Sequence, residues 1–268
     1  MYCLFPPLLY RRTAADVESQ LLQSVASDRF QCKVPPSPHR YTLEEVKIKD
    51  VVLRLVAVHQ MEMREAHLVL TGQRIWPAAK VLGLYLVENP DIVQSAGSVL
   101  ELGAGPGLPG LVAAKLAPQP ERVVLTDNKD LVLDLLEKNI VKNFNDDPMA
   151  VKPRCSHLEW GKGVADFRDQ HGGFDVILAS DVIYHRPDIP LLLQTARDLL
   201  NDKPTSVLLL SYNDRAKIFQ QTVKETAAEC GLEWTDIPFR ELLPEFSQIV
   251  HPDEVRHLHL MVFMKGAS

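Results

Sequence analysis

Residues 99–107 read Val-Leu-Glu-Leu-Gly-Ala-Gly-Pro-Gly, an apolar run followed at once by three alternating glycines. A helical pattern comes next, so the glycines lie between a predicted buried strand, 98–102, and a predicted helix, 108–116. Glycine permits positive φ and close approach of a ligand to the backbone, and a helix N-terminus carries partial positive charge. The pattern predicts a loop that binds a nucleotide-like ligand; a tight turn without a ligand is the alternative.

A carboxylate follows at the end of the next predicted strand, because Asp127 closes the apolar run 123–126, 26 positions after Glu101. An acid at this place binds ribose hydroxyls in many nucleotide sites, whereas a plain helix cap is the alternative. Dinucleotide enzymes and S-adenosylmethionine enzymes both use this crevice. The Gly-x-Gly-x-Gly register after a glutamate differs from the G-x-G-x-x-G fingerprint of dinucleotide sites, which favours S-adenosylmethionine as the cofactor.

Strand and helix patterns alternate over most of the chain. The predicted strands are 98–102, 123–126, 174–179, 207–210 and 257–263, and the predicted helices are 77–88, 108–116, 131–141, 191–200 and 218–230. This alternation is typical of parallel sheets with helical crossovers. We therefore expect an α/β fold with one open, doubly wound, Rossmann-like sheet.

The N-terminal part of the chain has a different character. Pro35, Pro36 and Pro38 cluster after a polar helical stretch, 14–27, and no glycine precedes Gly72. We predict that residues 1–40 form an N-terminal appendage and that residues 41–268 form one domain. The apolar runs 51–53 and 68–70 indicate a strand pair between residues 41 and 70.

Composition excludes several classes of protein. The 29 Lys and Arg residues against 35 Asp and Glu residues give a net charge of −6, without the basic excess that nucleic acid binding favours. The four cysteines are scattered and show no zinc-ligand spacing, so we expect reduced thiols, no metal site and a cytoplasmic, also nuclear, protein. No apolar run approaches the ~18 residues of a membrane span, and the basic pair Arg11–Arg12 follows the apolar N-terminus, unlike in a signal peptide.

Four motifs resemble those of the seven-β-strand S-adenosylmethionine methyltransferases, in particular their protein-lysine methyltransferase group. They are the loop 100–107; Thr126–Asp127 with Asn139 and Asn143 in the next helix; the segments 72–78 and 158–161, with Trp-Pro-Ala and Leu-x-Trp-Gly elements; and Asp181-x-x-Tyr184. The likeness covers residues 41–265 in order. It implies a seven-stranded methyltransferase domain that binds S-adenosylmethionine. Pro106 departs from the usual small or hydroxylated residue of such loops and removes one backbone donor.

The resemblance implies two sets of site residues. Asp181 is expected to contact the acceptor amine or to fix the active-site loop, and Tyr184 is expected to line the amine channel. A helix cap and a half-buried loop tyrosine are the respective alternatives. Glu101 is expected to orient the glycine loop or the methionine amine, and Trp160 to pack on the adenine. The expected cofactor-binding residues are Trp76, Glu101, Gly103, Ala104, Gly105, Gly107, Asp127, Asn128, Trp160 and Ser180.

The resemblance also implies the activity, namely transfer of a methyl group to a lysine side chain of a specific cytosolic protein. Two alternatives stay open at this point. One is a methyltransferase for a small amine or for protein histidine or arginine, and the other is a catalytically silent binding module. We expect a monomer, because no long amphipathic or heptad segment suggests an obligate assembly.

Overall fold

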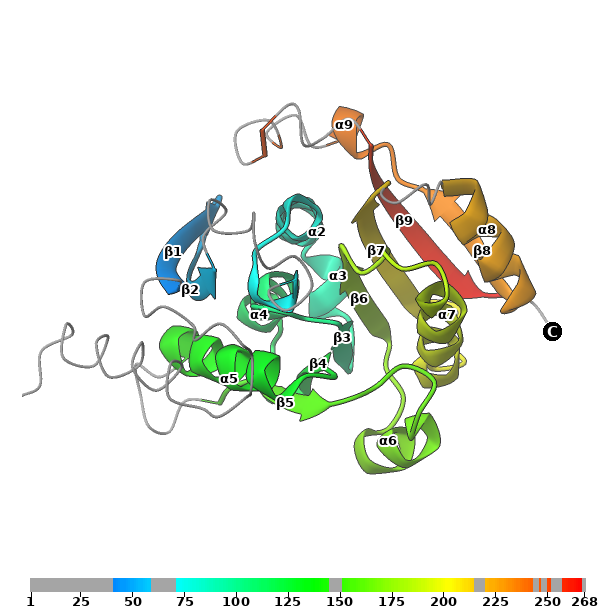
Figure 1. Cartoon of the computed structure of the whole chain (residues 1–268), viewed down its shortest axis with the longest axis horizontal. Coiled ribbons are helices and arrows are strands. Elements are labelled where there is room, and N and C mark those ends of the chain that lie inside the picture. Colours follow the sequence, from blue (N-terminus) through cyan, green and yellow to red (C-terminus); the bar gives the residue numbers. More distant parts are fainter. Residues whose placement is uncertain are drawn as a thin grey trace, which may run out of the picture.

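The computed structural model describes residues 41–58, 71–144, 151–214, 220–242, 246, 250–251 and 257–266. The expected appendage, 1–40, and the apolar run 68–70 lie outside these ranges. The described residues form a seven-stranded sheet with helices on both faces and a separate two-stranded hairpin (Figure 1). None of their helices is long and apolar enough to cross a membrane.

The seven-stranded sheet confirms the predicted α/β fold. Its strands lie in the order β5 (Arg154–His157), β4 (Val123–Asp127), β3 (Val99–Leu102), β6 (Val176–Ser180), β7 (Val207–Asn213), β9 (Leu258–Lys265) and β8 (Leu232–Asp236). The strands from β5 to β7 pair in parallel, whereas β9 runs antiparallel to both of its neighbours. The chain leaves β3 toward β4 on one side and later returns to β6 on the other. This reversal is the topological switch point at which open α/β sheets bind ligands.

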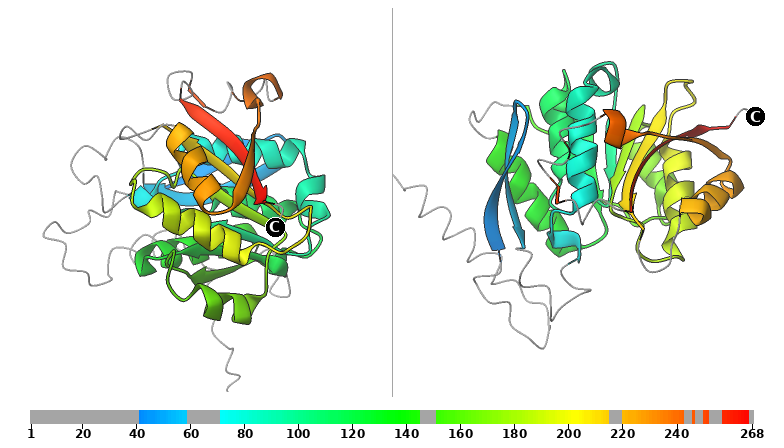
Figure 2. Two further views of the ribbon diagram at one scale, coloured as in Figure 1. Left: turned by 90° about the vertical axis from the view of Figure 1, so that its right-hand side faces the viewer. Right: turned by 90° about the horizontal axis from the view of Figure 1, so that it is seen from above.

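Helices cover both faces of the sheet, as the right-hand view of Figure 2 shows. One face carries α2 (Pro77–Glu88), α4 (Leu108–Leu116) and α5 (Asp130–Phe144), and the other carries α6 (Val164–His171), α7 (Asp188–Leu199) and α8 (Gln220–Glu229). Alternate strand residues enter different cores: Val99 packs with the first set of helices, and Leu100 packs with the second. Because both faces are covered, the central strands read as continuous apolar runs. The described residues also form the short helices α3 (Asp91–Gln94) and α9 (Phe239–Leu242) and the 3₁₀ helices η2 (Thr71–Gln73) and η3 (Pro120–Arg122).

The ends of α2 and α4 follow from local residue chemistry. Pro77 opens α2, where its missing N–H costs no helical hydrogen bond, and the helix ends at Glu88, with Asn89 as its C-cap ahead of Pro90. Gly107 precedes α4 with a φ of 87°, in the left-handed region that glycine adopts most readily. The predicted helices 77–88 and 108–116 have the same bounds as α2 and α4.

The predicted strand pair near the N-terminus is present at residues 41–58. Strand β1 (Tyr41–Ile48) pairs with β2 (Val51–Val58) in an antiparallel register that joins Tyr41 to Val58. The hairpin lies beyond α5, on the far side of the helical layer from the sheet (Figure 2). Its strands are not part of the seven-stranded sheet.

Five α-helices and strands of the described residues had no predicted counterpart, namely the short helices α3 and α9 and the mostly polar elements β5, α6 and β8. Only Phe167 of α6 and only Leu232 of β8 are buried. A helix or strand that buries one side chain shows almost no apolar periodicity, so its pattern is that of a polar loop.

We expect Gly107→Ala to destabilise the fold far more than Gly163→Ala, although both glycines precede a helix with a left-handed φ. A Cβ at Gly107 would lie 2.4 Å from Leu136 Cδ1, whereas one at Gly163 would have no atom within 4 Å. The left-handed backbone costs both variants about 1–2 kcal/mol, and overpacking adds about 1–3 kcal/mol at Gly107 alone. Urea unfolding of the two variants measures the difference, and equal losses would contradict the packing argument.

Candidate active site

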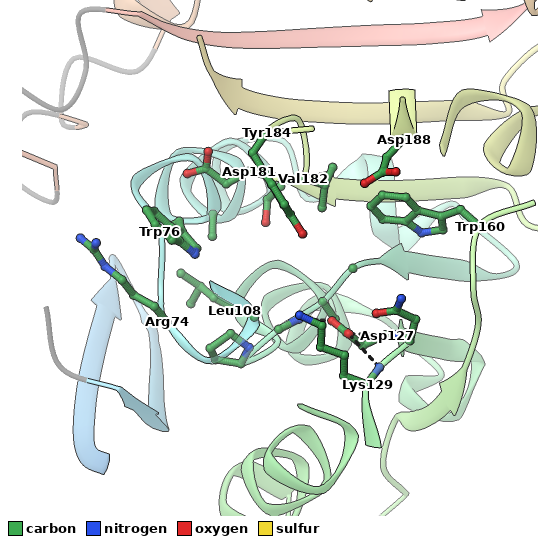
Figure 3. Close-up of a pocket in the computed structure, with 18 of the residues that line it drawn as sticks. Arg74, Trp76, Leu108, Asp127, Lys129, Trp160, Asp181, Val182, Tyr184 and Asp188 are labelled. Carbon is green, nitrogen blue, oxygen red and sulfur yellow. Dashed lines mark hydrogen bonds between the residues drawn. The ribbon is translucent and has the colours of Figure 1, made fainter. Parts of the chain in front are cut away.

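A pocket opens at the carboxyl ends of β3, β4 and β6, at the switch point of the sheet (Figure 3). It has a volume of about 1050 Å³ with its open mouth included. Its walls come from the segment before α2, the loop after β3, the turns after β4 and β5, and the loop between β6 and α7. Segments that are far apart in the sequence therefore meet in one cavity.

Ten of the twelve predicted site residues line this pocket. They are Trp76, Gly103, Ala104, Gly105, Asp127, Asn128, Trp160, Ser180, Asp181 and Tyr184. The other two, Glu101 and Gly107, are buried and do not line it. The structure thus brings together residues from all four motifs of the sequence.

The loop after β3 forms the floor of the pocket, and its glycines leave little room for an added side chain. Gly103 has a φ of 63°, and a Cβ there would lie 2.8 Å from Val182 Cγ1 and 3.1 Å from Trp160 Cζ2. The Ala104 N–H donates to the Thr126 carbonyl at 2.8 Å, which ties the loop to β4. The absence of a side chain at Gly103 lets the Trp160 wall approach the loop backbone.

Asp127 joins the loop after β3 to the turn after β4. Its Oδ2 accepts from the Gly105 N–H at 3.3 Å, and its Oδ1 accepts from the N–H groups of Asn128 at 2.9 Å and Lys129 at 3.3 Å. Burial raises the pKa of the carboxyl, while these backbone donors and the Lys129 ammonium oppose the rise. The side chain therefore both organises the turn before α5 and faces the cavity.

Asp181 and Tyr184 lie in the loop that leads from β6 to α7. Asp181 is buried with a φ of 55°, and its N–H donates to the Ser211 carbonyl of β7 at 2.8 Å. Since α7 begins only at Asp188, Asp181 is too far upstream to cap that helix. Tyr184 is 41% exposed, and burial, followed by the carboxylates of Asp127 and Asp188, raises its pKa, so its phenol stays protonated at neutral pH.

Two tryptophans stand on different sides of the cavity (Figure 3). The ring of Trp76 is covered by the Arg74 guanidinium, whose Cζ lies 4.5 Å from the ring centroid. Trp160 packs against the core beneath α7. Both rings therefore pack against fixed neighbours, Trp76 against Arg74 and Trp160 against the core.

Four charged pocket residues were not predicted, and one of them, Glu159, lies inside the segment 158–161. Arg74 lies inside the segment 72–78, and Lys129 directly follows Asn128, so closeness to a motif was the only signal for them. Asp188 starts α7 and carries an ion pair with His185, at 3.1 Å between Oδ1 and Nδ1. Nothing in the residues around Asp188 indicates that α7 points its first turn at the cavity.

Glu101 is fully buried beside the pocket. Its Oε2 accepts from the Gly110 N–H in the first turn of α4 at 2.9 Å, and its Oε1 has no hydrogen-bond partner among the described residues. Burial raises the pKa of this carboxyl well above its usual range, and the nearby Asp127 carboxylate raises it further. The contact with Gly110 ties β3 to α4.

We expect Glu101→Gln to flatten the loss of stability with rising pH. A carboxyl with a raised pKa in the folded state stabilises the fold below its unfolded value of about 4.3, and this contribution is lost as the pH rises through the folded value. Glutamine stays neutral, so the free energy of unfolding of the variant should fall less between pH 5 and 9. Urea titrations at a series of pH values measure this, with the exposed Glu121→Gln as the control. The same pH slope in Glu101→Gln and wild type would refute the assignment.

The cavity offers carboxylates and a protonated phenol at one wall and close-packed backbone at another. Such groups can accept and donate hydrogen bonds to an amine without a metal. In the described part of the chain, no three His, Cys, Asp or Glu side chains are grouped to hold a metal ion.

The sequence is similar to known protein methyltransferases. A family described as lysine methyltransferase matches residues 56–227. The Protein N-lysine methyltransferase METTL21A of Xenopus tropicalis is 41% identical over 138 residues, which are 51% of this chain and 58% of that protein. METTL21A of Danio rerio is 32% identical over 195 residues, 72% of this chain and 78% of that protein. The Protein-lysine N-methyltransferase EFM3 of Chaetomium thermophilum is 31% identical, with 60% of this chain and 47% of that protein covered.

The chain thus spans little more than half the length of the first of these relatives.

Solved structures share the fold at low sequence identity. A putative methyltransferase complexed with SAH matches with a TM-score of 0.56 at 12% identity, over 86% of this chain and 57% of that one. A putative SAM-dependent methyltransferase from Streptococcus mutans matches with a TM-score of 0.57 at 13% identity, over the same shares.

Proposed function

The chain belongs to the lysine methyltransferase family, and on that premise we propose that it transfers a methyl group from S-adenosylmethionine to a lysine side chain of a protein. The observation that carries the proposal is the convergence of ten predicted site residues on one pocket at the switch point. The acceptor is inferred from the family, because fold alone does not imply a reaction.

The pocket residues suit S-adenosylmethionine. The loop Gly103–Gly105 carries no side chain larger than the Ala104 methyl group, so its backbone can take the amino-acid end of the cofactor. Asp127 is placed to accept hydrogen bonds from the ribose hydroxyls, since its carboxylate faces the cavity at the end of β4. Asn128 and Trp160 would flank the adenine. Bound there, the cofactor supplies an electrophilic methyl group on a sulfonium.

Asp181 and Tyr184 are proposed to hold the acceptor amine. The carboxylate of Asp181 would accept from the amine, and the protonated hydroxyl of Tyr184 would orient it. Alignment of two reactants lowers the activation barrier by up to about 7–11 kcal/mol. We therefore assign most of the rate acceleration by this chain to the positioning of the amine and the cofactor.

The acceptor must lose its proton before it can attack. A free lysine has a pKa near ~10.4, and an apolar environment lowers it. Val182 and Leu108 line the same cavity and exclude water from part of it. The exposed Tyr184 and Leu191 at the pocket favour a protein acceptor over a small amine, because they offer apolar contact area outside the cavity.

We expect Asp127→Ala to weaken the binding of S-adenosylhomocysteine by about 10- to 100-fold, because hydrogen bonds to a charged group contribute about 1.5–3 kcal/mol. Isothermal titration calorimetry measures the affinity. Glu159→Ala is the control, since Glu159 also lines the pocket but is paired with Lys162 at 2.7 Å. Wild-type affinity in Asp127→Ala would remove Asp127 from the cofactor site.

We expect Asp181→Asn to lower methyl transfer by about 10²-fold while cofactor affinity stays within about twofold of wild type. Asparagine is the chosen substitute because it tolerates the left-handed backbone of Asp181, as alanine does not. The assay incubates the protein with labelled S-adenosylmethionine and a cytosolic extract, separates the proteins on a gel and maps the modified residue by mass spectrometry.

A discrete labelled protein band with methylated lysine, lost in Asp181→Asn, is the expected result. Label confined to small molecules would replace the protein acceptor by a metabolite amine. Label on an N-terminal amine would change the acceptor, an activity that the name of the Neurospora crassa relative efm7 includes. No cofactor binding by the wild-type protein would refute the proposal.

A further inference from the structure

Two asparagines of α5 bind the free edge of β2. The Asn143 side chain accepts from the Arg54 N–H at 2.8 Å and donates to the Arg54 carbonyl at 2.9 Å. The Asn139 side chain accepts from the Val56 N–H at 2.7 Å and donates to the Val56 carbonyl at 3.1 Å. Each side-chain amide thus replaces one residue of a missing neighbouring strand.

The spacing of the two asparagines matches the spacing of the strand. Residues four apart on a helix are about 6 Å apart along its axis, and residues two apart on a strand are about 6.7 Å apart. Alternate residues of an edge strand point their N–H and carbonyl groups to the same side. Asn139 and Asn143 therefore meet Val56 and Arg54 without distortion of either element.

The two asparagines differ in one contact. Asn139 Nδ2 also donates to the Pro106 carbonyl, in the glycine loop that lines the pocket, at 3.0 Å. Asn143 Nδ2 donates instead to the Asn139 carbonyl of its own helix, at 2.8 Å. Asn139 is fully buried, so no water replaces its hydrogen bonds.

The hairpin reaches a second wall of the pocket through β1. The Tyr41 hydroxyl donates to Gln73 Oε1, and Gln73 is 1% exposed. Gln73 stands between Gly72 and Arg74, which both line the pocket. The hairpin is therefore bonded to the segment before α2 directly and to the glycine loop through Asn139.

We propose that Asn139 is a positioning residue that holds the glycine loop in its cofactor-binding conformation and couples it to the β1–β2 hairpin. This inference rests on the proposed function, because it assumes that the glycine loop binds S-adenosylmethionine. It assigns a role in cofactor binding to a side chain outside the pocket and to a hairpin outside the seven-stranded sheet. Asn143 holds the same hairpin and has no such role.

The test compares Asn139→Asp with Asn143→Asp in the full chain at pH 7.5. A carboxylate keeps the acceptor for the β2 N–H but has no N–H to donate, so both variants weaken the hairpin contact and only Asn139→Asp releases the Pro106 carbonyl. We expect the affinity for S-adenosylhomocysteine to fall about tenfold in Asn139→Asp, equivalent to about 1.4 kcal/mol, and to stay within about twofold in Asn143→Asp. Calorimetry is done below the melting transition of both variants, as recorded by circular dichroism.

A second measurement needs only the wild-type protein. If the coupling exists, saturating S-adenosylhomocysteine should slow hydrogen exchange of the β2 amides, with the Val56 N–H, which donates to Asn139, as the direct reporter. The exposed strand end at Asp236 of β8 serves as the internal control.

Wild-type affinity in Asn139→Asp, or unchanged hydrogen exchange of β2 on ligand binding, would overturn the role of Asn139. Equal losses in both variants would show that the hairpin acts through stability alone and would overturn it as well. Failure of the wild-type protein to bind S-adenosylhomocysteine would instead refute the proposed function.

Discussion

The backbone after β3 has to turn at the centre of the sheet with almost no space around it. Trp160 and Val182 approach Gly103 from one side, and Leu136 approaches Gly107 from the other. Side chains at these glycines would clash or require a left-handed backbone that L-residues rarely adopt. At Gly103 and Gly105 the floor of the pocket is therefore bare backbone. The positions of the walls follow from it, because the turns after β4 and β5 and the loop after β6 all pack against this loop.

Two buried carboxylates near this loop are stabilised in different ways. Asp127 accepts three backbone N–H groups, which oppose the pKa rise caused by its burial. Glu101 accepts one, from Gly110, and its pKa is raised further by Asp127. A buried carboxyl with few donors favours its neutral form. Asp127 thus keeps the character of a hydrogen-bond acceptor toward the cavity, while Glu101 links β3 to α4.

The β1–β2 hairpin extends these constraints beyond the sheet. A strand edge that packs against a helix must find partners for its N–H and carbonyl groups. Asn139 and Asn143 supply them, and Asn139 shares its amide with the loop at the pocket. The same side-chain amide therefore both pairs with the hairpin backbone and holds the glycine loop. The third motif of the sequence, 72–78, meets the same hairpin through Gln73.

The sequence by itself determined the alternating strands and helices, the glycine loop and Asp127, because apolar runs, glycines and strand-end acids act within a few positions of the chain. The other predicted residues that line the pocket came from the resemblance of the motifs to a known family. Polar elements such as α6 and β8 bury too little to be predicted. Only the tertiary structure decided that β9 is antiparallel, that Arg74 and Asp188 reach the cavity, that Glu101 and Gly107 do not line it, and that Asn139 touches both hairpin and loop. These features depend on the register and packing of segments distant in the sequence, which local patterns do not encode.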